Sequence, residues 1–435
     1  MELSAVRPEE EKLRLEQLKL AKARLGRELN SARKAGAVPD WLQLEFQALS
    51  AEMKALQKRL KQRLNHAPVE QKWAPPTLVP DNAILERMVE GPVVVRLCDV
   101  GLSDAADAYV SCHPASSIWH RPVITSFIAE MCRHPTRCLI AVAGDSSIVG
   151  ILSLVRLESR LFGNFMVSVP YFNYGGVLAD NSMAANALID AANHWRRQKS
   201  ATHLELRHVG NLALGLPQRT NKVSFWLGLP DTPQKLWDSF KPKLRAQIRR
   251  AERESVEFVV GGSECLDDFY RVFAENMRDL GTPVYGRRFF RGLLSHLPGN
   301  SWLVVVKIEQ KVVGCAFLAG YRDRLEIPWA STLRSVSHTG INMLMYWKIL
   351  EFAIARGFRV FDFGRCSENA GTYHFKKQWG AQPIPLHWDY ILGDGEELPA
   401  LTPDNPKYRL LIAAWKKLPV WAANLLGPPI VRMLP

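Results

Sequence analysis

The chain has 435 residues, of which 47% are hydrophobic and 23% are charged. This length and balance exclude a largely disordered chain and leave room for two domains with appendages. The formal net charge of +13 favours polyanionic partners, such as nucleic acid, a nucleotide cofactor, a diphosphate lipid or an anionic membrane face, although it also serves solubility alone.

The cysteines and the N-terminal residues indicate a reducing compartment. The seven cysteines are scattered and form no CxxC pair, so the sequence predicts neither a disulfide framework nor a metal site. The first residues mix acidic and basic side chains without an apolar stretch, so we expect no signal peptide. No apolar run is long enough to cross a membrane, and we therefore expect a cytoplasmic protein.

Residues 1–66 are predicted to form a helical hairpin or coiled coil. A break containing Gly36 and Pro39 separates two helices, and Asp40 is a candidate N-cap. In the second helix, apolar residues recur in steps of four and three: Leu42, Phe46, Leu49, Met53, Leu56 and Leu60. Such a seam suits folding back, homodimerisation, binding a partner protein or docking on the main body. The Pro-rich residues 67–92 are predicted to be a linker.

Residues 93–228 and 229–395 repeat one order of elements, which predicts a tandem duplication. Each block contains a strand–turn–strand segment, a further strand, a helix and a last strand. In the first block these elements are expected at 138–158, 167–178, 186–198 and 203–209. In the second block they are expected at 302–323, 325–332, 341–357 and 359–365.

The tail, residues 396–435, is apolar but interrupted by prolines and by Lys416 and Lys417. Two interpretations remain open for it. It is either an amphipathic segment that lies on a membrane surface or a helix packed on the body of the protein.

The repeated order matches the core of the GNAT (acyl-CoA N-acyltransferase-like) fold, an α/β (α+β) architecture. In that fold two neighbouring strands diverge, and the acyl carbonyl of the donor occupies the gap. Catalysis then requires positioning, stabilisation of an oxyanion and a base for the amine. A conventional CoA site has a glycine-rich loop before the central helix, but residues 337–342 retain only Gly340.

Two charged residues of the last strand are candidate site residues. Asp362 lies inside an apolar run, where a carboxylate needs a partner. It is interpreted as a proton acceptor, as an orienter of Arg365, or as a structural residue in a strand-end cap or a salt bridge. Arg365 is placed at the carboxyl end of the strand to bind an anionic substrate, and Ser367 adds a hydroxyl. Residues 241–253 are strongly basic and present either a phosphate-binding helix or a solvated face, with candidate contacts Lys243, Arg245 and Arg249.

Three segments together resemble the FemAB-like (FemABX) peptidyltransferase family: LRAQIRRAERE (244–254), FAENMRDLGTPVYGRRFF (273–290) and FDFGRCSENAGTYHFKKQWGAQPIPLHW (361–388). The resemblance covers about residues 90–395 and is strongest to the branch associated with exosortase/PEP-CTERM and exopolysaccharide loci. Members have two GNAT-like domains and move an aminoacyl group from charged tRNA to an amine of a cell-wall precursor.

The resemblance implies particular site residues. A Phe-Lys pair lines the donor channel in the family and matches Phe375-Lys376 here, so Lys376 is expected to stabilise the oxyanion or bind the donor's phosphate–sugar end. Further candidate contacts are Tyr373, Lys377, Asn276, Arg278, Tyr285 and Trp329. The family's PRGPV-like motif in the first domain reads PYFNYGGV (170–177) here, so we expect different acceptor contacts.

The sequence therefore predicts an acyl or aminoacyl transferase that acts on an amine acceptor in cell-envelope or exopolysaccharide biosynthesis. No covalent cofactor is expected, and the donor is either aminoacyl-tRNA or acyl-CoA. The acceptor is an amine-bearing envelope precursor, and contact with the inner membrane face is a further expectation. One alternative is a CoA-dependent N-acyltransferase of an amino sugar or peptide, and another is a non-catalytic scaffold. The first copy is expected to form a wall of the one active site in the second.

Overall fold

The computed structural model describes residues 8–34, 36–66, 73–368, 370–399 and 406–434. The chain divides into two compact units, Met1–Lys72 and Trp73–Pro435. We call the second unit the body.

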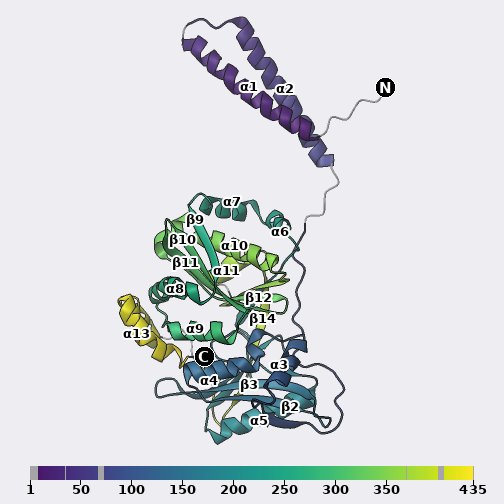
Figure 1. Cartoon of the computed structure of the whole chain (residues 1–435), viewed down its shortest axis with the longest axis vertical. Helices are drawn as coiled ribbons and strands as arrows, with labels where there is room; N and C mark the ends of the chain where they lie inside the picture. Colours follow the sequence, from purple (N-terminus) through teal and green to yellow (C-terminus); the bar gives the residue numbers. More distant parts are fainter. Residues whose placement is uncertain (1–7, 35, 67–72, 369, 400–405, 435) are drawn as a thin grey trace. The chain divides into compact units, whose positions relative to one another are not determined.

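The first unit is a pair of helices, α1 (Pro8–Lys34) and α2 (Asp40–His66), shown in purple in Figure 1. Leu25 and Leu29 of α1 are buried against Leu42 of α2, and Phe46 and Leu49 extend the contact. The predicted apolar seam therefore joins the two helices of the hairpin. The side chain of Leu60, also assigned to the seam, lies outside the described residues.

The body contains both repeats. The first comprises β1 (Val94–Leu97), α3 (Ser103–Cys112), α4 (Pro122–Cys132), β2 (Thr136–Val142), β3 (Ile148–Ser159), β4 (Gly163–Val167), β5 (Leu178–Ala179), α5 (Ser182–Gln198), β6 (His203–Val209), β7 (Gln218–Arg219) and β8 (Lys222–Gly228). The second comprises α6 (Pro233–Ser239), α7 (Pro242–Ala251), β9 (Val256–Gly261), α8 (Leu266–Leu280), α9 (Arg287–His296), β10 (Ser301–Ile308), β11 (Lys311–Tyr321), β12 (Arg324–Thr332), α10 (Ile341–Ala355), β13 (Val360–Ser367), α11 (Gly371–Lys377) and β14 (Gln382–Leu392). Helices α12 (Pro406–Trp415) and α13 (Val420–Val431) follow.

The described strands join in one sheet in the order β1-β2-β3-β4-β6-β14-β8-β13-β12-β11-β10-β9, with β5 on β3 and β7 on β14. Each repeat contains one parallel pair within otherwise antiparallel neighbours. These pairs are β4 with β6 and β12 with β13, and both are short. The tandem GNAT-like α/β architecture predicted from the repeat is present.

The two repeats exchange their last strands. Strand β8 follows the first repeat in sequence but pairs with β13 of the second. Strand β14 ends the second repeat but pairs with β6 of the first, and it also contacts β8. The predicted boundary between residues 228 and 229 therefore divides the sequence but not the sheet, because each half of the sheet needs a strand from the other repeat.

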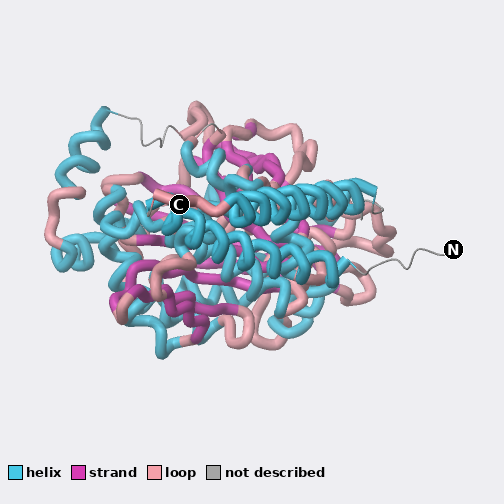
Figure 2. The backbone as a smooth tube through the Cα atoms, turned by 90° about the horizontal axis from the view of Figure 1, so that it is seen from above, coloured by secondary structure: helices cyan, strands magenta, loops and turns pink. Residues whose placement is uncertain are grey.

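Helices lie along the strands on both sides (Figure 2). Apolar side chains of α6, α7 and α10 form one core with β8, β12 and β13. On the opposite face α4, α8 and α9 form a second core that joins the repeats, with α4 packed directly on α9. This second face carries most of the candidate site.

Two sequence predictions are corrected by the body. Residues 73–92 are not a free linker, because Leu85 and Arg87 hydrogen-bond the backbone beside β5, and Gln382 holds residues 76 and 78. Residues 167–178 are mostly not a strand. After Val167 the chain leaves β4 and runs as a loop until β5, for a reason given below.

The tail packs on the body, as the second of its two interpretations predicts. Ala423 and Val431 of α13 are buried, and the Arg432 carbonyl accepts hydrogen bonds from His134 and Tyr171. Among the described residues, no helix is both long enough and apolar enough to cross a membrane.

The exchanged strands predict that the body unfolds in one cooperative transition. Tyr390 of β14 is buried in the first half of the sheet and donates a hydrogen bond to Glu205 (2.7 Å). We expect Tyr390→Ala to lower the free energy of unfolding by about 3–5 kcal/mol and to shift the whole transition. Leu161→Ala, at an exposed turn, should change it by less than about 0.5 kcal/mol. Guanidinium titrations followed by tryptophan fluorescence and circular dichroism test this, and separate transitions for the two repeats, beyond any transition of the helices α1 and α2, would contradict it.

Candidate active site

The centre of the candidate site is the point where β12 and β13 diverge. The two strands pair only through Arg324–Val360, Leu325–Phe361 and Glu326–Asp362, and no further pair follows along either strand. Pairing of β13 with β8 is also interrupted between Asp362 and Arg365, and Gly364 has a φ of +72°. A gap therefore opens beyond Glu326 and Asp362, as the GNAT-like order predicts.

Lys376 lies at this gap. Its side chain comes from α11 and is buried, and the ammonium Nζ donates to the carbonyl oxygens of Gly364 (2.7 Å) and Arg365 (3.0 Å). Burial lowers the pKa of the Lys376 ammonium. An ammonium has three donors, so one remains for a ligand after these two bonds. The structure thus brings Lys376 to the same point as Asp362 and Arg365.

Asp362 is an anchor and not a base. Its carboxylate accepts hydrogen bonds from the Tyr174 hydroxyl, Ser224 Oγ (2.8 Å), Trp226 Nε1 (3.0 Å) and the Gly364 amide (2.8 Å). Four donors occupy the acceptor positions that a carboxylate offers. The predicted roles as proton acceptor or orienter of Arg365 are therefore corrected, because no acceptor position is left and no bond joins the two side chains among the described residues.

Glu326, opposite Asp362 on β12, is a better candidate for proton transfer, and the sequence analysis missed it. It is buried, with hydrogen bonds from Trp119 Nε1 (2.6 Å) and Asn173 Nδ2 (2.6 Å). Burial, followed by the neighbouring Asp362, raises its pKa to about 8. A carboxyl group with such a pKa exchanges its proton near neutral pH. The signal was available, because Glu326, like Asp362, is a carboxylate within an apolar strand.

Arg365 provides a positive charge that the protein leaves unused. No hydrogen bond to its guanidinium is formed among the described residues, and its Nη1 is buried. The group lies over the Trp388 ring, 5.2 Å from the ring centroid, and Arg207 lies over the same ring at 4.5 Å. Burial, and then Arg207, lower the pKa of Arg365 to about 10. A cation held in this way can bind an anionic group of a ligand.

Aromatic rings line the same face. Trp329 makes edge contacts with Tyr285 (5.7 Å between centroids) and Phe172 (6.1 Å). The Tyr285 ring also stacks on Phe289 (4.5 Å), and burial raises the pKa of its hydroxyl. The predicted residues Trp329 and Tyr285 therefore lie together on the face that carries Glu326 and Arg365.

Four predicted residues of the segment 367–377 have different surroundings. Phe375 contacts Tyr346 of α10 edge-on (5.0 Å between centroids), and Tyr373 contacts Phe225 (4.9 Å). The Ser367 hydroxyl accepts from Lys222 Nζ (2.5 Å). Lys377 is exposed beside buried Lys376. Three of these residues belong to the helix α11 that carries Lys376, and Ser367 ends the strand before it.

Two predicted substrate contacts on α8 are engaged within the protein. Asn276 Nδ2 donates to Ser331 Oγ on β12 (2.9 Å). Arg278 donates through Nε to Asp279 (2.6 Å) and through Nη1 to the Leu418 carbonyl (3.0 Å). Arg278 thus holds the segment before α13, and the prediction that it contacts substrate is corrected.

The remaining predicted residues lie at the start of α10 and on α7 beside it. Gly340 precedes this helix with a φ of +82°, and an added Cβ would lie 3.3 Å from the Gln247 carbonyl of α7. Lys243 and Arg249 are exposed on α7, Arg249 over the Trp237 ring (5.4 Å). Arg245 is 4.0 Å from Asp238. The basic helix therefore borders the loop where a GNAT fold holds its donor.

The gap of the first repeat is closed by its own chain. After β4, residues 168–177 form a loop that bonds to β6: the Arg207 amide donates to Ser168 Oγ, and the Gly176 amide donates to the Arg207 carbonyl. Gly176 lies against the His208 ring, where an added Cβ would be 2.0 Å from Cδ2. This loop is why the predicted strand 167–178 is absent.

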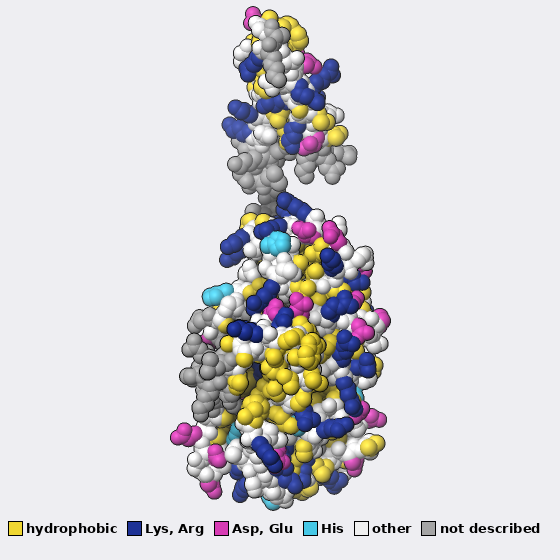
Figure 3. All heavy atoms as spheres, turned by 90° about the vertical axis from the view of Figure 1, so that its left-hand side faces the viewer, with side chains coloured by type: hydrophobic (Ala, Val, Ile, Leu, Met, Phe, Trp, Pro, Cys, Tyr) yellow, Lys and Arg dark blue, Asp and Glu magenta, His cyan; other side chains and the backbone are white. Residues whose placement is uncertain are grey.

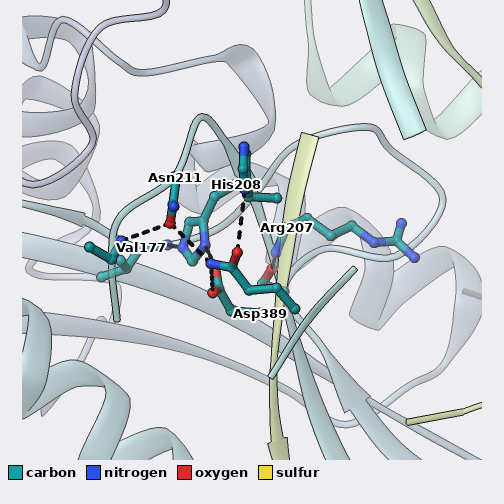
Figure 4. Close-up of polar contacts among 9 residues, drawn as sticks. Val177, Arg207, His208, Asn211 and Asp389 are labelled. Carbon is teal, nitrogen blue, oxygen red and sulfur yellow. Dashed lines mark hydrogen bonds and ion pairs between the residues drawn. The ribbon is translucent and has the colours of Figure 1, made fainter. Parts of the chain in front are cut away.

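A buried His–Asp pair joins β6 of the first repeat to β14 of the second, and it is fixed by its hydrogen bonds rather than catalytic. His208 Nδ1 is 2.7 Å from Asp389 Oδ2, while Nε2 accepts a hydrogen bond from the Val177 amide (3.0 Å). Figure 4 shows the ring between these two partners, with the Arg207 side chain extending away from them. Both ring nitrogens are engaged, so His208 has no free position for a proton in transit.

The same loop supplies the second repeat with two residues, Asn173 on Glu326 and Tyr174 on Asp362. Beside them lies a pocket of about 210 Å³ lined by both repeats, including Ser116, Ser117, Tyr321, Arg322, Arg324 and Glu326. Arg324 lies over Trp226 (3.8 Å), and its Nε has no hydrogen-bond partner among the described residues. The pocket therefore combines an acid–base candidate with an unpaired cation.

Known proteins give three comparisons. Residues 238–377 match the family described as acetyltransferase (GNAT) domain. The match lies within the second repeat. No curated protein matches the chain.

Among solved structures, the chain is similar to FemX with a TM-score of 0.55 and 15% identity, over 71% of this chain and 98% of that one. It is also similar to L-PGS from Bacillus licheniformis (TM-score 0.47, 13% identity, 74% and 98% covered). A tandem GNAT protein from the clavulanic acid biosynthesis pathway is similar with a TM-score of 0.46 and 12% identity, over 69% of this chain and 97% of that one. The FemX comparison shows a shared fold, and the GNAT match supports an acyltransferase.

The raised pKa of Glu326 makes stability depend on pH. The folded-state pKa, about 8, lies above the ordinary value of 4.5, so the folded state holds this proton more tightly than the unfolded state does. The resulting stabilisation is complete below the unfolded pKa and is lost as pH rises through about 8. We expect wild type to lose stability relative to Glu326→Gln between about pH 5 and about pH 8, as measured by urea unfolding. Parallel pH curves for the two proteins would show that Glu326 is not perturbed.

Proposed function

We propose that this protein transfers an acyl or aminoacyl group to an amine acceptor, with the reaction centred between β12 and β13. The observation that carries the proposal is the convergence of the Lys376 ammonium and the buried Glu326 carboxyl at the divergence of these strands. A transfer to an amine needs both a hydrogen-bond donor for the oxyanion, which an ammonium provides, and a group that takes the amine proton.

In this proposal the donor carbonyl enters the gap from the side of α10 and α11. The third donor of Lys376 binds the oxygen of that carbonyl as negative charge develops, while the Gly364 and Arg365 carbonyls keep the ammonium in place. The acceptor lies in the pocket on the opposite face, beside Glu326. Glu326 in its ionised form accepts the proton that the amine loses when it attacks the carbonyl. The tetrahedral intermediate then collapses, and the bond between the acyl carbon and the sulfur or ribose oxygen of the donor breaks. The thiol or hydroxyl leaves with the proton that Glu326 returns.

We propose an acceptor that carries an anionic group in addition to its amine. Arg324 and Arg365 lie on the Glu326 side of the sheet, and neither guanidinium is fully satisfied among the described residues. Leaving a buried cation unpaired costs free energy, which a carboxylate or phosphate of the acceptor recovers. An envelope or exopolysaccharide precursor with an amino sugar or a peptide amine has this chemistry, and the resemblance to FemAB-like proteins supports such an acceptor.

The donor remains either aminoacyl-tRNA or acyl-CoA in this proposal. Both present phosphates, and the exposed basic side chains of α7 next to Gly340 suit either. Residues 238–377, which match the GNAT domain family, favour acyl-CoA as a second candidate. The reduction of the glycine-rich loop to Gly340 favours aminoacyl-tRNA. Native mass spectrometry of the donor that co-purifies with the protein distinguishes them.

The role of Lys376 is tested by a matched pair of variants. Lys376→Ala removes the cation at the gap, and we expect transfer to fall by about 10²–10³-fold with little change in the KM for the acceptor. Lys377→Ala removes the exposed neighbouring charge and should change the rate by less than about threefold. Single-turnover assays, with melting temperatures to confirm folding, measure both. Equal effects of the two substitutions would refute the assigned role.

The donor-side role of α7 is tested by charge reversal. We expect Arg249→Glu to weaken donor binding and to reduce the slope of log affinity against log salt by about one if Arg249 contacts one phosphate. Arg96→Glu makes the same charge change on exposed β1 and serves as the control. Calorimetric titrations with acetyl-CoA and with charged tRNA at several salt concentrations provide the measurement. Identical salt slopes for both variants and wild type would place the donor elsewhere.

A further inference from the structure

The outer side of α13 is an exposed apolar surface. Trp421 is 71% exposed and Leu425 is 68% exposed, one helical turn apart, and Leu426 adjoins them. We define the apolar patch as these three residues together with exposed Leu280 of α8 and Leu411 of α12. A continuous area of hydrophobic side chains lies on this side of the body in Figure 3. Soluble proteins seldom leave large side chains grouped in this way without a binding partner.

The helix that carries the patch is firmly fixed. Its inner face is buried, and Gly427 packs against Val284 so closely that an added Cβ would be 2.7 Å from the Val284 amide. Arg278 holds the Leu418 carbonyl before the helix, and Tyr171 holds the Arg432 carbonyl after it. The outward position of Trp421 and Leu425 is therefore a built feature of the fold and not the result of a loose terminal segment.

The charged residues that flank α13 in the sequence have one sign. Exposed Lys416 and Lys417 precede α13, and exposed Arg432 follows it. Residues 406–434 contain no aspartate or glutamate. An apolar helix face with a tryptophan and flanking cations is the composition of segments that lie in the interface of anionic membranes.

We propose that α13 and the adjoining leucines dock the body on the surface of an anionic phospholipid bilayer. Trp421, Leu425 and Leu426 enter the region between headgroups and acyl chains, while Lys416, Lys417 and Arg432 contact the phosphates. The docking itself does not depend on the proposed function. Its link to that function is that Pro428 of α13 lies against Gly286, next to Tyr285 of the candidate site, so a docked protein holds this site near the membrane.

Vesicle flotation with the full chain tests the proposal. Vesicles of phosphatidylglycerol and phosphatidylcholine in equal parts should carry the protein upward at low salt, and binding should decrease as salt is raised. The double variant Trp421→Ser/Leu425→Ser should weaken binding by roughly 10-fold or more. Lys416→Glu/Lys417→Glu should weaken it mainly at low salt. Leu161→Ser, an equally exposed leucine on the first repeat, should bind as wild type does.

Three results would overturn the proposal. The first is no flotation of wild type at low salt, and the second is equal binding by the Trp421/Leu425 variant. The third is sedimentation analysis showing that wild type is a dimer and the variant a monomer, which would identify the patch as an interface between copies. Loss of donor or transfer activity with unchanged vesicle binding would instead concern only the proposed function. Melting temperatures of all variants establish that they are folded.

Discussion

Asp362 accepts hydrogen bonds from donors that come from separate parts of the chain. Tyr174 belongs to the loop of the first repeat, Ser224 and Trp226 to β8, and Gly364 to β13 itself. A buried carboxylate is tolerated only when its acceptor positions are filled, so each of these partners is fixed in place by the same requirement. This interaction sets the position of the loop that carries Asn173, and through Asn173 the position of Glu326.

The exchange of β8 and β14 has the same effect on a larger scale. The strand that completes the second half of the sheet brings Ser224 and Trp226 to Asp362. The strand that completes the first half brings Trp388 under both Arg207 and Arg365. A symmetric duplication has become one site, because the loop 168–177 closes the first gap and supports the second. The first repeat contributes binding surface and hydrogen bonds, while the gap with Lys376 belongs to the second.

Much of this fold could be predicted from the sequence. Apolar runs with turn residues between them mark β2–β3 and β10–β11, and the wide apolar face of α10 marks a helix packed on a sheet. The strand exchange could not be predicted, because β8 and β14 have the same local pattern whichever half they join. The loop after Val167 was missed for a related reason. Half of its residues are β-branched or aromatic, as in a strand, whereas Pro170, Gly175 and Gly176 are turn residues. Only the contacts to His208 and Arg207 show that the loop fills a gap.

The candidate site was predicted in part. Trp329 and Tyr285 lie together on the face of Arg365, and the Lys376 ammonium donates to the Arg365 carbonyl. Asp362 and Glu326 give the same signal in sequence, a carboxylate within an apolar strand, so the sequence offers no way to choose between them. Only the count of donors around each carboxylate separates an anchor with four partners from a group that keeps a proton near neutral pH. Arg278 was misassigned because its partner, the Leu418 carbonyl, is distant in sequence.

The position at which the acyl carbonyl binds is the central claim of the proposed reaction. A crystal structure of the body with a non-hydrolysable analogue of the bound donor measures this directly. We predict that the carbonyl oxygen lies between β12 and β13, within hydrogen-bond distance of Lys376 Nζ. The reacting carbon should lie on the side of Glu326. A donor bound at the first repeat, or one whose carbonyl lies away from Lys376, would contradict it.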